Sequence, residues 1–122
     1  MKLSIHKNKL SVKTSIGRVE IAKGASGESR LCLFRSGVVV ICNTHPLNWY
    51  PHKRELKKYA LSLARKWLNP KCRLVEYTVT TKTDDTAQLG KVDKFHYIQP
   101  RNVAVEEDYA TSHHAYKFRI ID

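Results

Sequence analysis

The stretch Pro51–Leu68, PHKRELKKYALSLARKWL, decides the fold, because it carries the clearest helical periodicity in the chain. Apolar side chains recur along it every three or four residues, which places them on one face of a helix with about 3.6 residues per turn. Pro51 suits a first helical turn, where its missing N–H costs no hydrogen bond. Asn69-Pro70 ends the pattern, since a residue before proline disfavours the α region. The apolar stripe comprises Leu56, Tyr59, Ala60, Leu63, Ala64, Trp67 and Leu68.

The opposite face of this predicted helix is basic. Arg54, Lys58 and Arg65 occupy it, with Lys57 and Lys66 flanking it, while Glu55 is the only acid in the helix. A solvated helix face normally mixes charges of both signs, because opposite charges at i and i+4 attract and like charges repel. The excess of positive charge therefore favours an anionic partner for this face.

Short strands are predicted on both sides of the helix. Apolar and polar residues alternate over residues 2–23, and the alternation changes parity across residues 6–9, which indicates a turn. The wholly apolar, β-branched run Val38–Ile41 is typical of a strand buried on both faces, so we expect it to be central and covered by the helix. Further strands or extended pieces are predicted at residues 30–34, 72–82, 92–98, 103–105 and 115–121, with turns at 23–29, 36–37 and 83–85 and a first helical turn at 106–108.

These elements predict an α+β fold. A mainly antiparallel sheet of about six to eight short strands would pack against one long amphipathic helix, at about residues 51–68. The chain of 122 residues is long enough for a single domain, residues 1–122, with one core. It has no apolar run of membrane-spanning length and no apolar signal-peptide core, so we expect an intracellular, cytoplasmic protein without a membrane partner.

The three cysteines support an intracellular location. Cys32, Cys42 and Cys72 are odd in number, form no CxxC pair and lie among apolar residues. We therefore expect reduced, buried thiols. Cysteine and histidine spacings typical of a zinc site are missing from the sequence, so no metal site is assigned.

Positive charge is concentrated in the first part of the chain. Residues 1–73 hold 16 Lys and Arg against three Asp and Glu, a balance of +13, whereas residues 74–122 hold six against eight, a balance of −2. Such asymmetry bears on partners rather than on fold. It suits a phosphate-bearing partner, which could be nucleic acid, a nucleotide or an anionic membrane surface, and the alternative is a charge that serves solubility only.

The connection Cys42–Tyr50 brings polar and aromatic residues to the start of the helix. A helix N-terminus carries positive partial charge, so this region is a candidate site for an anion or for base stacking. Alternatively, Trp49 and Tyr50 only close the end of the helix against the sheet.

Strand residues on the same face should add to the basic surface, from among Lys2, Lys7, Lys9, Lys13, Arg18 and Lys23. The predicted nucleic-acid-binding residues are Trp49, Tyr50, Lys53, Arg54, Lys57, Lys58 and Arg65.

No catalytic residue and no cofactor are assigned. His96, or one of the adjacent His113 and His114, would form an acid–base pair if it met a carboxylate of Glu106–Asp108, but surface histidines are the more common arrangement. The pair Asp84-Asp85 suits a turn better than a metal site.

One segment resembles a known enzyme family. Ala60, Leu61, Ala64 and Arg65, then Cys72, Leu74 and Val75, then Thr86, Ala87 and Leu89 are similar to the helix–strand segment of the phage-encoded S-adenosylmethionine-degrading enzymes. The resemblance covers about a quarter of the chain, mostly at core positions. The family's tyrosine and glutamate ahead of that helix have no counterpart here, so it implies no catalytic residue.

The sequence therefore predicts a nucleic-acid-binding protein that contacts phosphates through its early strands and its helix. One alternative is a small phage-type enzyme or a nucleotide-binding module acting on a nucleotide-like ligand. Another is an interaction protein that docks an acidic partner. Salt dependence separates these functions, because a nucleic acid with many phosphate contacts releases many counterions.

Overall fold

The computed structural model describes residues 1–82 and 90–122, so the turn predicted at 83–85 lies outside the described residues. The predicted α+β class is confirmed: the described residues form one helix and nine strands, in two antiparallel sheets rather than in the single sheet of six to eight strands that we expected. The chain divides into two compact units, which we call unit 1 (Met1–Pro70) and unit 2 (Lys71–Asp122). A single domain stays a prediction, and each unit is described by itself.

Unit 1 contains a five-stranded meander in which every strand pairs with the next one along the chain. The parity change predicted at residues 6–9 is the tight turn between the first two strands. Ser36 and Gly37, with φ values of 51° and 79°, form the turn between the last two. In chain order the strands are β1 (Lys2–His6), β2 (Lys9–Lys13), β3 (Gly17–Lys23), β4 (Ser29–Arg35) and β5 (Val38–His45).

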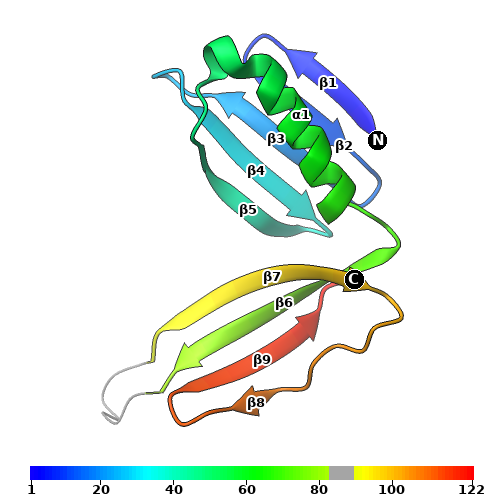
Figure 1. Ribbon diagram of the computed structural model, residues 1–122, viewed down its shortest axis with the longest axis vertical. Helices are drawn as coiled ribbons and strands as arrows, with labels where there is room; N and C mark the ends of the chain where they lie inside the picture. Colours follow the sequence, from blue (N-terminus) through cyan, green and yellow to red (C-terminus); the bar gives the residue numbers. More distant parts are fainter. Residues whose placement is uncertain (83–89) are drawn as a thin grey trace. The chain divides into compact units, whose positions relative to one another are not determined.

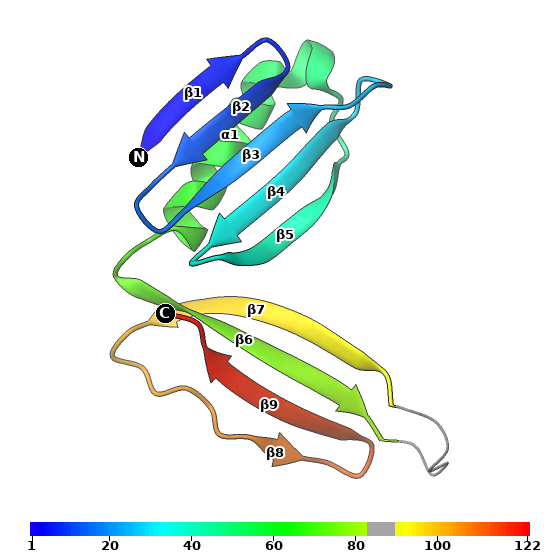
Figure 2. The same cartoon turned by 180° about the vertical axis from the view of Figure 1, so that it is seen from behind.

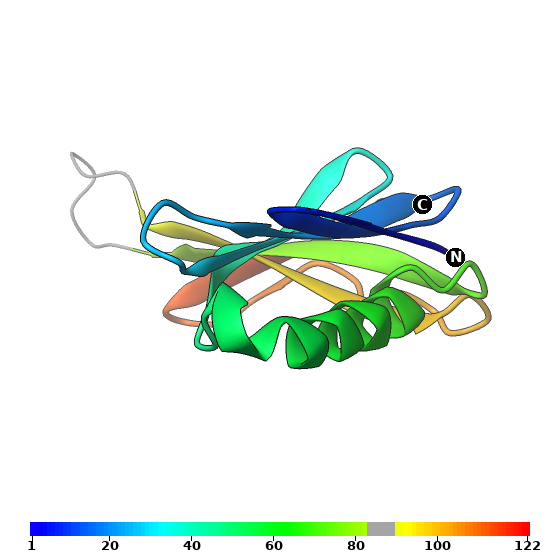
Figure 3. The ribbon, with the colours of Figure 1, turned by 90° about the horizontal axis from the view of Figure 1, so that it is seen from above.

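The predicted helix is present and crosses one face of this sheet. Helix α1 spans Trp49–Trp67, although Tyr50, Pro51 and His52 have non-helical backbone angles, so regular helix begins at Lys53. It lies in front of the strands in Figure 1 and behind them in Figure 2, and Figure 3 shows helix and sheet as two layers.

The core of unit 1 lies between the helix and the middle strands. The apolar side chains of β2, β3 and β4 on the helix side of the sheet are almost fully buried, and burial of each such side chain contributes about 1.5–3 kcal/mol. Tyr59, at the edge of the predicted stripe, remains 38% exposed. The core residues are Leu10, Val12, Val19, Ile21, Leu31, Leu33, Trp49, Leu56, Ala60, Ala64 and Leu68.

Arg35, at the end of β4, connects the sheet to the end of the helix. Its side chain is fully buried, and its Nη1 atom donates to the carbonyl oxygens of Trp67 at 3.0 Å and Asn69 at 3.1 Å. The last carbonyl groups of a helix lack partners within the helix and carry negative partial charge. A buried guanidinium therefore satisfies them directly.

The prediction that Val38–Ile41 is a central strand is wrong. Strand β5 lies at the edge of the sheet and pairs only with β4, and its residues are exposed or half-buried. A continuous apolar run is consistent with burial on both faces, but it contains no information on which strands flank it.

Unit 2 is a four-stranded antiparallel sheet with the strand order β7-β6-β9-β8. Its described residues contain no helix, so the first helical turn predicted at 106–108 is wrong. Of the two alternatives predicted for 103–105, a short strand or an extended piece, the strand is absent. Asp108 instead accepts a hydrogen bond from the backbone N–H of Phe118 at 2.8 Å, which attaches this segment to β9. The strands are β6 (Cys72–Thr81), β7 (Val92–Pro100), β8 (Tyr109–Ala110) and β9 (His114–Ile120).

Candidate nucleic-acid interface

The predicted basic residues of the helix form one surface of unit 1. Arg54, Lys58 and Arg65 are exposed, whereas Lys53 and Lys57 are half-buried. The ammonium group of Lys53 lies 5.6 Å from the centre of the Trp49 ring, and that of Lys66 lies 5.3 Å from the Trp67 ring. Lys53, Arg54 and Lys57 also line a hollow of about 380 Å³ together with Ile5 and Leu10. Several helix bases therefore already have a packing role, with their stems on apolar surface.

The two aromatic residues at the start of the helix have different environments. Trp49 is fully buried in the core, whereas Tyr50 is 60% exposed and its ring lies edge-on to that of Trp49 at 6.5 Å. Base stacking requires an exposed ring face, so Trp49 fits the alternative in which it closes the end of the helix. Tyr50 has the ring that a ligand can reach.

A second basic surface lies on the side of the β1–β5 sheet opposite α1, which we call the open face. Side chains alternate between the two faces of a strand, and the strand register places one set of alternate residues there. Figure 2 shows this face in front of the helix. Its cations are Lys2, Lys9, Lys13, Arg18 and Arg30, all exposed.

Three of these cations form a row across adjacent strands. Lys2 lies directly opposite Lys13, and Lys13 lies directly opposite Arg18. Directly opposed residues have Cβ atoms about 4.5–5.5 Å apart, and like charges at such positions destabilise a sheet. Lys2 and Lys13 form no ion pair with any residue in the described ranges 1–82 and 90–122. The repulsion within this row lowers the stability of unit 1, and the charges of Lys2 and Lys13 are not compensated by an ion pair among the described residues.

Among the described residues, Glu20 is the one carboxylate that a strand contributes to the open face. Its Oε1 atom lies 2.9 Å from Nε of Arg18 and 3.4 Å from Nζ of Lys9, so one carboxylate is shared by two cations. The guanidinium carbon of Arg18 also lies 4.2 Å from the centre of the Phe34 ring. The ion pair uses only Nε, and the terminal nitrogens of Arg18 make no hydrogen bond to the part of the chain that the structure describes. Arg18 is therefore held in place with donors still available for a ligand.

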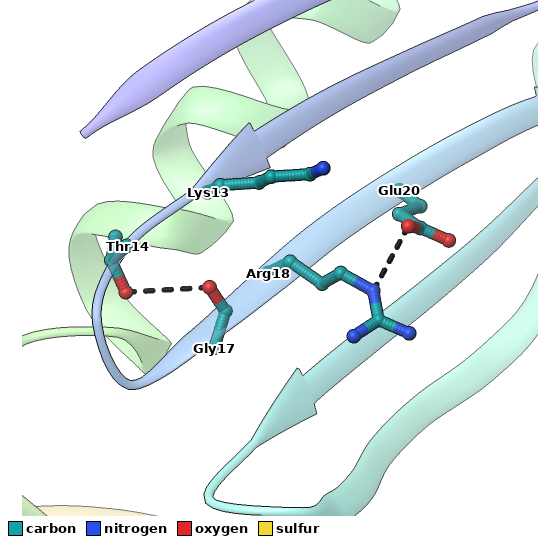
Figure 4. Close-up of a pocket in the computed structure, with 5 residues that line it drawn as sticks. All are labelled: Lys13, Thr14, Gly17, Arg18 and Glu20. Atoms are coloured by element: carbon teal, nitrogen blue, oxygen red, sulfur yellow. Dashed lines mark hydrogen bonds and ion pairs between the residues drawn. The ribbon is translucent and has the colours of Figure 1, made fainter.

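A hollow of about 400 Å³ lies at one end of this row. It is lined by Lys13, Thr14, Gly17, Arg18 and Glu20, and Figure 4 shows Lys13 and Arg18 extending on the same side of the sheet. The backbone N–H of Thr14 donates to the Gly17 carbonyl at 2.9 Å, which closes the β2–β3 turn beside it. Two cations at a hollow suit an oxyanion such as phosphate.

The prediction of buried thiols is wrong for all three cysteines, since Cys72 is half-buried and the other two belong to the open face. Cys42 is exposed and Cys32 is half-buried, on directly opposed positions of β5 and β4. Their Sγ atoms lie 3.3 Å apart, and burial together with this hydrogen bond raises the pKa of the Cys32 thiol. The residues around them are apolar, but the helix covers only the other side of the sheet.

His96, one of the histidines considered as a partner for Glu106–Asp108, pairs with a different carboxylate. His96 Nε2 lies 3.0 Å from Glu76 Oε2, on adjacent strands of unit 2, and Arg119 Nη2 donates to Glu76 Oε1 at 3.0 Å. Burial alone would raise the pKa of Glu76, but the hydrogen bonds from His96 and Arg119 outweigh it and hold that pKa below its ordinary value. Within the described residues no group of three or more His, Cys, Asp and Glu is placed to hold a metal ion, and Asp84-Asp85 lies outside those residues.

The division into units sharpens the charge asymmetry seen in the sequence. Residues 1–70 hold 14 Lys and Arg against three Asp and Glu, whereas residues 71–122 hold eight against eight. The entire net charge of +11 therefore belongs to unit 1. Sequence alternation could have identified the cations of the open face, but it could not reveal which face the helix covers.

Comparison with known proteins adds no family to this description. No protein-family model, no curated protein and no solved structure matches the chain. Among the residues that the structure describes, no helix combines the length and apolar character needed to span a membrane.

Proposed function

We propose that the chain binds nucleic acid, and that unit 1 contacts the phosphates through the open face of its sheet. The observation that carries this proposal is the row Lys2–Lys13–Arg18, in which like charges lie directly opposite one another. An anionic ligand would remove the repulsion that the row otherwise creates. Phosphate contacts of this kind supply affinity without reading sequence.

The open face suits phosphate binding better than the helix does, although the sequence analysis predicts contacts through the helix as well. The helix bases Lys53 and Lys66 pack over tryptophan rings, and Lys57 is half-buried. Their positive charge has a structural explanation in unit 1, because the stems cover apolar surface. Lys2 and Lys13 are exposed, and among the described residues they make neither an ion pair nor a contact with an aromatic ring.

Two variants with equal charge test which surface binds. One replaces Lys2, Lys13 and Arg18 with Gln, and the other replaces Arg54, Lys58 and Arg65 with Gln, so that each removes three positive charges. The measurement is the affinity for labelled single-stranded and duplex DNA and RNA across a salt series. The slope of log affinity against log salt is negative and becomes shallower when phosphate contacts are lost. If the open face makes three phosphate contacts with duplex DNA, its variant should make the slope shallower by about 2–3 units, and the helix variant by less than about one unit.

A folding control and three contrary outcomes accompany this test of nucleic-acid binding by the open face. Thermal unfolding must first show that both variants fold. Equal loss in the two variants would mean that only total charge matters, and a larger loss in the helix variant would move the interface to α1. Binding to polyglutamate as tight as to nucleic acid at the same salt concentration would indicate an acidic protein partner instead.

A second candidate function is the binding of a nucleotide-like small molecule, which the hollow beside Lys13 and Arg18 favours. A small ligand makes few phosphate contacts, so its affinity should depend only weakly on salt and should not rise with the length of an oligonucleotide. Titration with mononucleotides and with oligonucleotides of increasing length distinguishes this function from polymer binding.

A further inference from the structure

One side of the unit 2 sheet carries a series of stacked aromatic rings. Tyr77 on β6 lies directly opposite Phe95 on β7 and Phe118 on β9, with ring centres 5.1 and 5.5 Å away. Tyr109 on β8 continues the series, 6.2 Å from Phe118 and 4.5 Å from Tyr116. Angles between neighbouring ring planes are 16–24°. These rings come from four strands and form one continuous aromatic surface.

A hollow of about 690 Å³ adjoins this surface, within the size range of ligand sites. Tyr97 forms a wall of different orientation, because its ring is inclined by 55° to that of Tyr77 at 5.9 Å. Val103, Ala104 and Glu106, from the segment between β7 and β8, also line it. The hollow is therefore bounded by rings of two orientations and by one carboxylate.

The segment that carries Glu106 is held to the sheet at both ends. The Gln99 side-chain amide donates to the carbonyl of Val103 at 3.0 Å, and Asp108 accepts from the Phe118 N–H at 2.8 Å. Glu106 itself lies between these two attachments. The backbone on both sides of Glu106 is thus attached to the sheet, while its side chain is exposed and lines the hollow.

The acidic side chain in the lining of the hollow is that of Glu106. The lining contains no Lys or Arg among the residues that the structure describes, and its other titratable group besides the tyrosines, His96, is hydrogen-bonded to Glu76. Burial raises the pKa of the Tyr97 and Tyr109 hydroxyls, and the nearby charge of Glu106 raises both further. A phosphate-bearing ligand would meet repulsion from Glu106.

We propose that this hollow binds an organic cation of the quaternary or methylated ammonium class. Aromatic ring faces attract such cations, and several rings around one ammonium group are a recurrent way to recognise it. Glu106 adds a charge opposite to that of the ligand. An ammonium group covered by methyl groups has less hydration to lose on binding than a small inorganic cation has. The site is separate from the open face of unit 1 and takes a ligand of the opposite charge.

The first test compares choline with 3,3-dimethylbutan-1-ol, which has the same shape but a carbon atom in place of the charged nitrogen. The full chain is titrated with each by calorimetry and by amide-resolved NMR. Choline should bind, with shifts concentrated at Tyr97, Glu106 and Tyr109, and the neutral alcohol should bind about tenfold more weakly or not at all. Equal binding of the two would overturn the proposal, as would tighter binding of adenosine than of choline.

A matched pair of variants locates the site. Glu106→Gln should weaken choline binding severalfold, whereas Glu107→Gln removes the same charge from the neighbouring residue, which does not line the hollow, and should leave affinity unchanged. Tyr97→Leu should also weaken binding, and the neutral isostere should then lose less than choline does. Equal effects of the two glutamate variants would overturn the proposal.

Two further measurements distinguish choline binding from self-association of the chain and from nucleic-acid binding by unit 1. Shifts of the same resonances on dilution, without choline, would mean that a second copy of the chain fills the hollow, and would overturn it. The Lys2, Lys13 and Arg18 variant should bind choline like the parent. The proposal therefore stands or falls independently of nucleic-acid binding by unit 1.

Discussion

Each unit contains an antiparallel sheet, but the apolar side chains of the two sheets are covered in different ways. In unit 1 the helix covers one face and creates a core of eleven buried residues, including Leu10, Ile21 and Leu56. In unit 2, whose described residues include no helix, the apolar residues that become fully buried are Leu74 and Val75. Its large side chains instead stack on one another along one face. The same alternating strand pattern therefore leads to a closed core or to a partly exposed aromatic surface.

The units also differ in electrostatics, which separates their proposed ligands. Unit 1 carries the whole net charge of +11, with cations on both the helix and the open face. Unit 2 is neutral by composition, and the charge at its aromatic hollow is a carboxylate. An average over the whole chain would hide this contrast, because it would assign one basic character to both.

The largest expected effect concerns the core of unit 1. Trp49→Ala removes a fully buried ring and should lower the free energy of unfolding by about 3–5 kcal/mol. Tyr50→Ala removes its exposed neighbour and should change stability by no more than about 0.5 kcal/mol. Urea unfolding followed by circular dichroism measures both. Similar values for the two variants would contradict the different burial of these adjacent rings.

The destabilisation caused by Trp49→Ala should be confined to the strands that pack against the helix. Amide hydrogen exchange reports protection strand by strand. With Trp49→Ala, protection in β2, β3 and β4 should fall, because these strands hold the core against α1. A greater loss in β6 and β9 would contradict the assignment of Trp49 to the core of unit 1.

An intermediate effect is expected at the end of the helix. Arg35→Met keeps an apolar stem but removes the donors to Trp67 and Asn69, and should cost about 2–3 kcal/mol, since hydrogen bonds from charged groups are among the stronger ones. Arg30→Met on the same strand, with a side chain 67% exposed, is the control and should stay within about 0.5 kcal/mol. Chemical denaturation compares them. Equal destabilisation would show that the buried arginine does not support the helix.

The smallest effect is expected in unit 2, and it depends on pH. The folded-state pKa of Glu76 is lowered, so its contribution is complete above the unfolded-state value of about 4.3 and is lost as the pH falls through the lower folded-state value. Glu76→Gln should therefore cost about 1–2 kcal/mol at neutral pH, and the difference from the parent should shrink in acid.

The control for this pH dependence is Asp93→Asn, also in unit 2. Its side chain is 46% exposed and its partner Lys91 lies 3.9 Å away, so it should change stability by less than about 0.5 kcal/mol at any pH. Urea midpoints at a series of pH values give both curves. A Glu76→Gln deficit that grew in acid would contradict the lowered pKa.

Local patterns suffice to predict much of this protein. The spacing of Leu56, Ala60 and Ala64 predicts the helix and its buried face, because helical periodicity depends only on neighbours along the chain. The parity change across residues 6–9 likewise predicts the first hairpin, and the charge count locates the excess of positive charge in the first part of the chain. The residues of the open face share one parity on successive strands, so their common surface follows from alternation once the register is known.

The pairing of segments that are distant in the chain could not be predicted from the sequence and is seen only in the folded structure. Register brings Tyr77, Phe95 and Phe118 side by side although they are far apart in the chain, and it gives His96 the partner Glu76. The edge position of Val38–Ile41, the burial of Trp49 and the role of Arg35 likewise depend on which element covers which face. Periodicity is a property of neighbouring residues, whereas burial and partner choice arise from surfaces that meet only after the chain has folded.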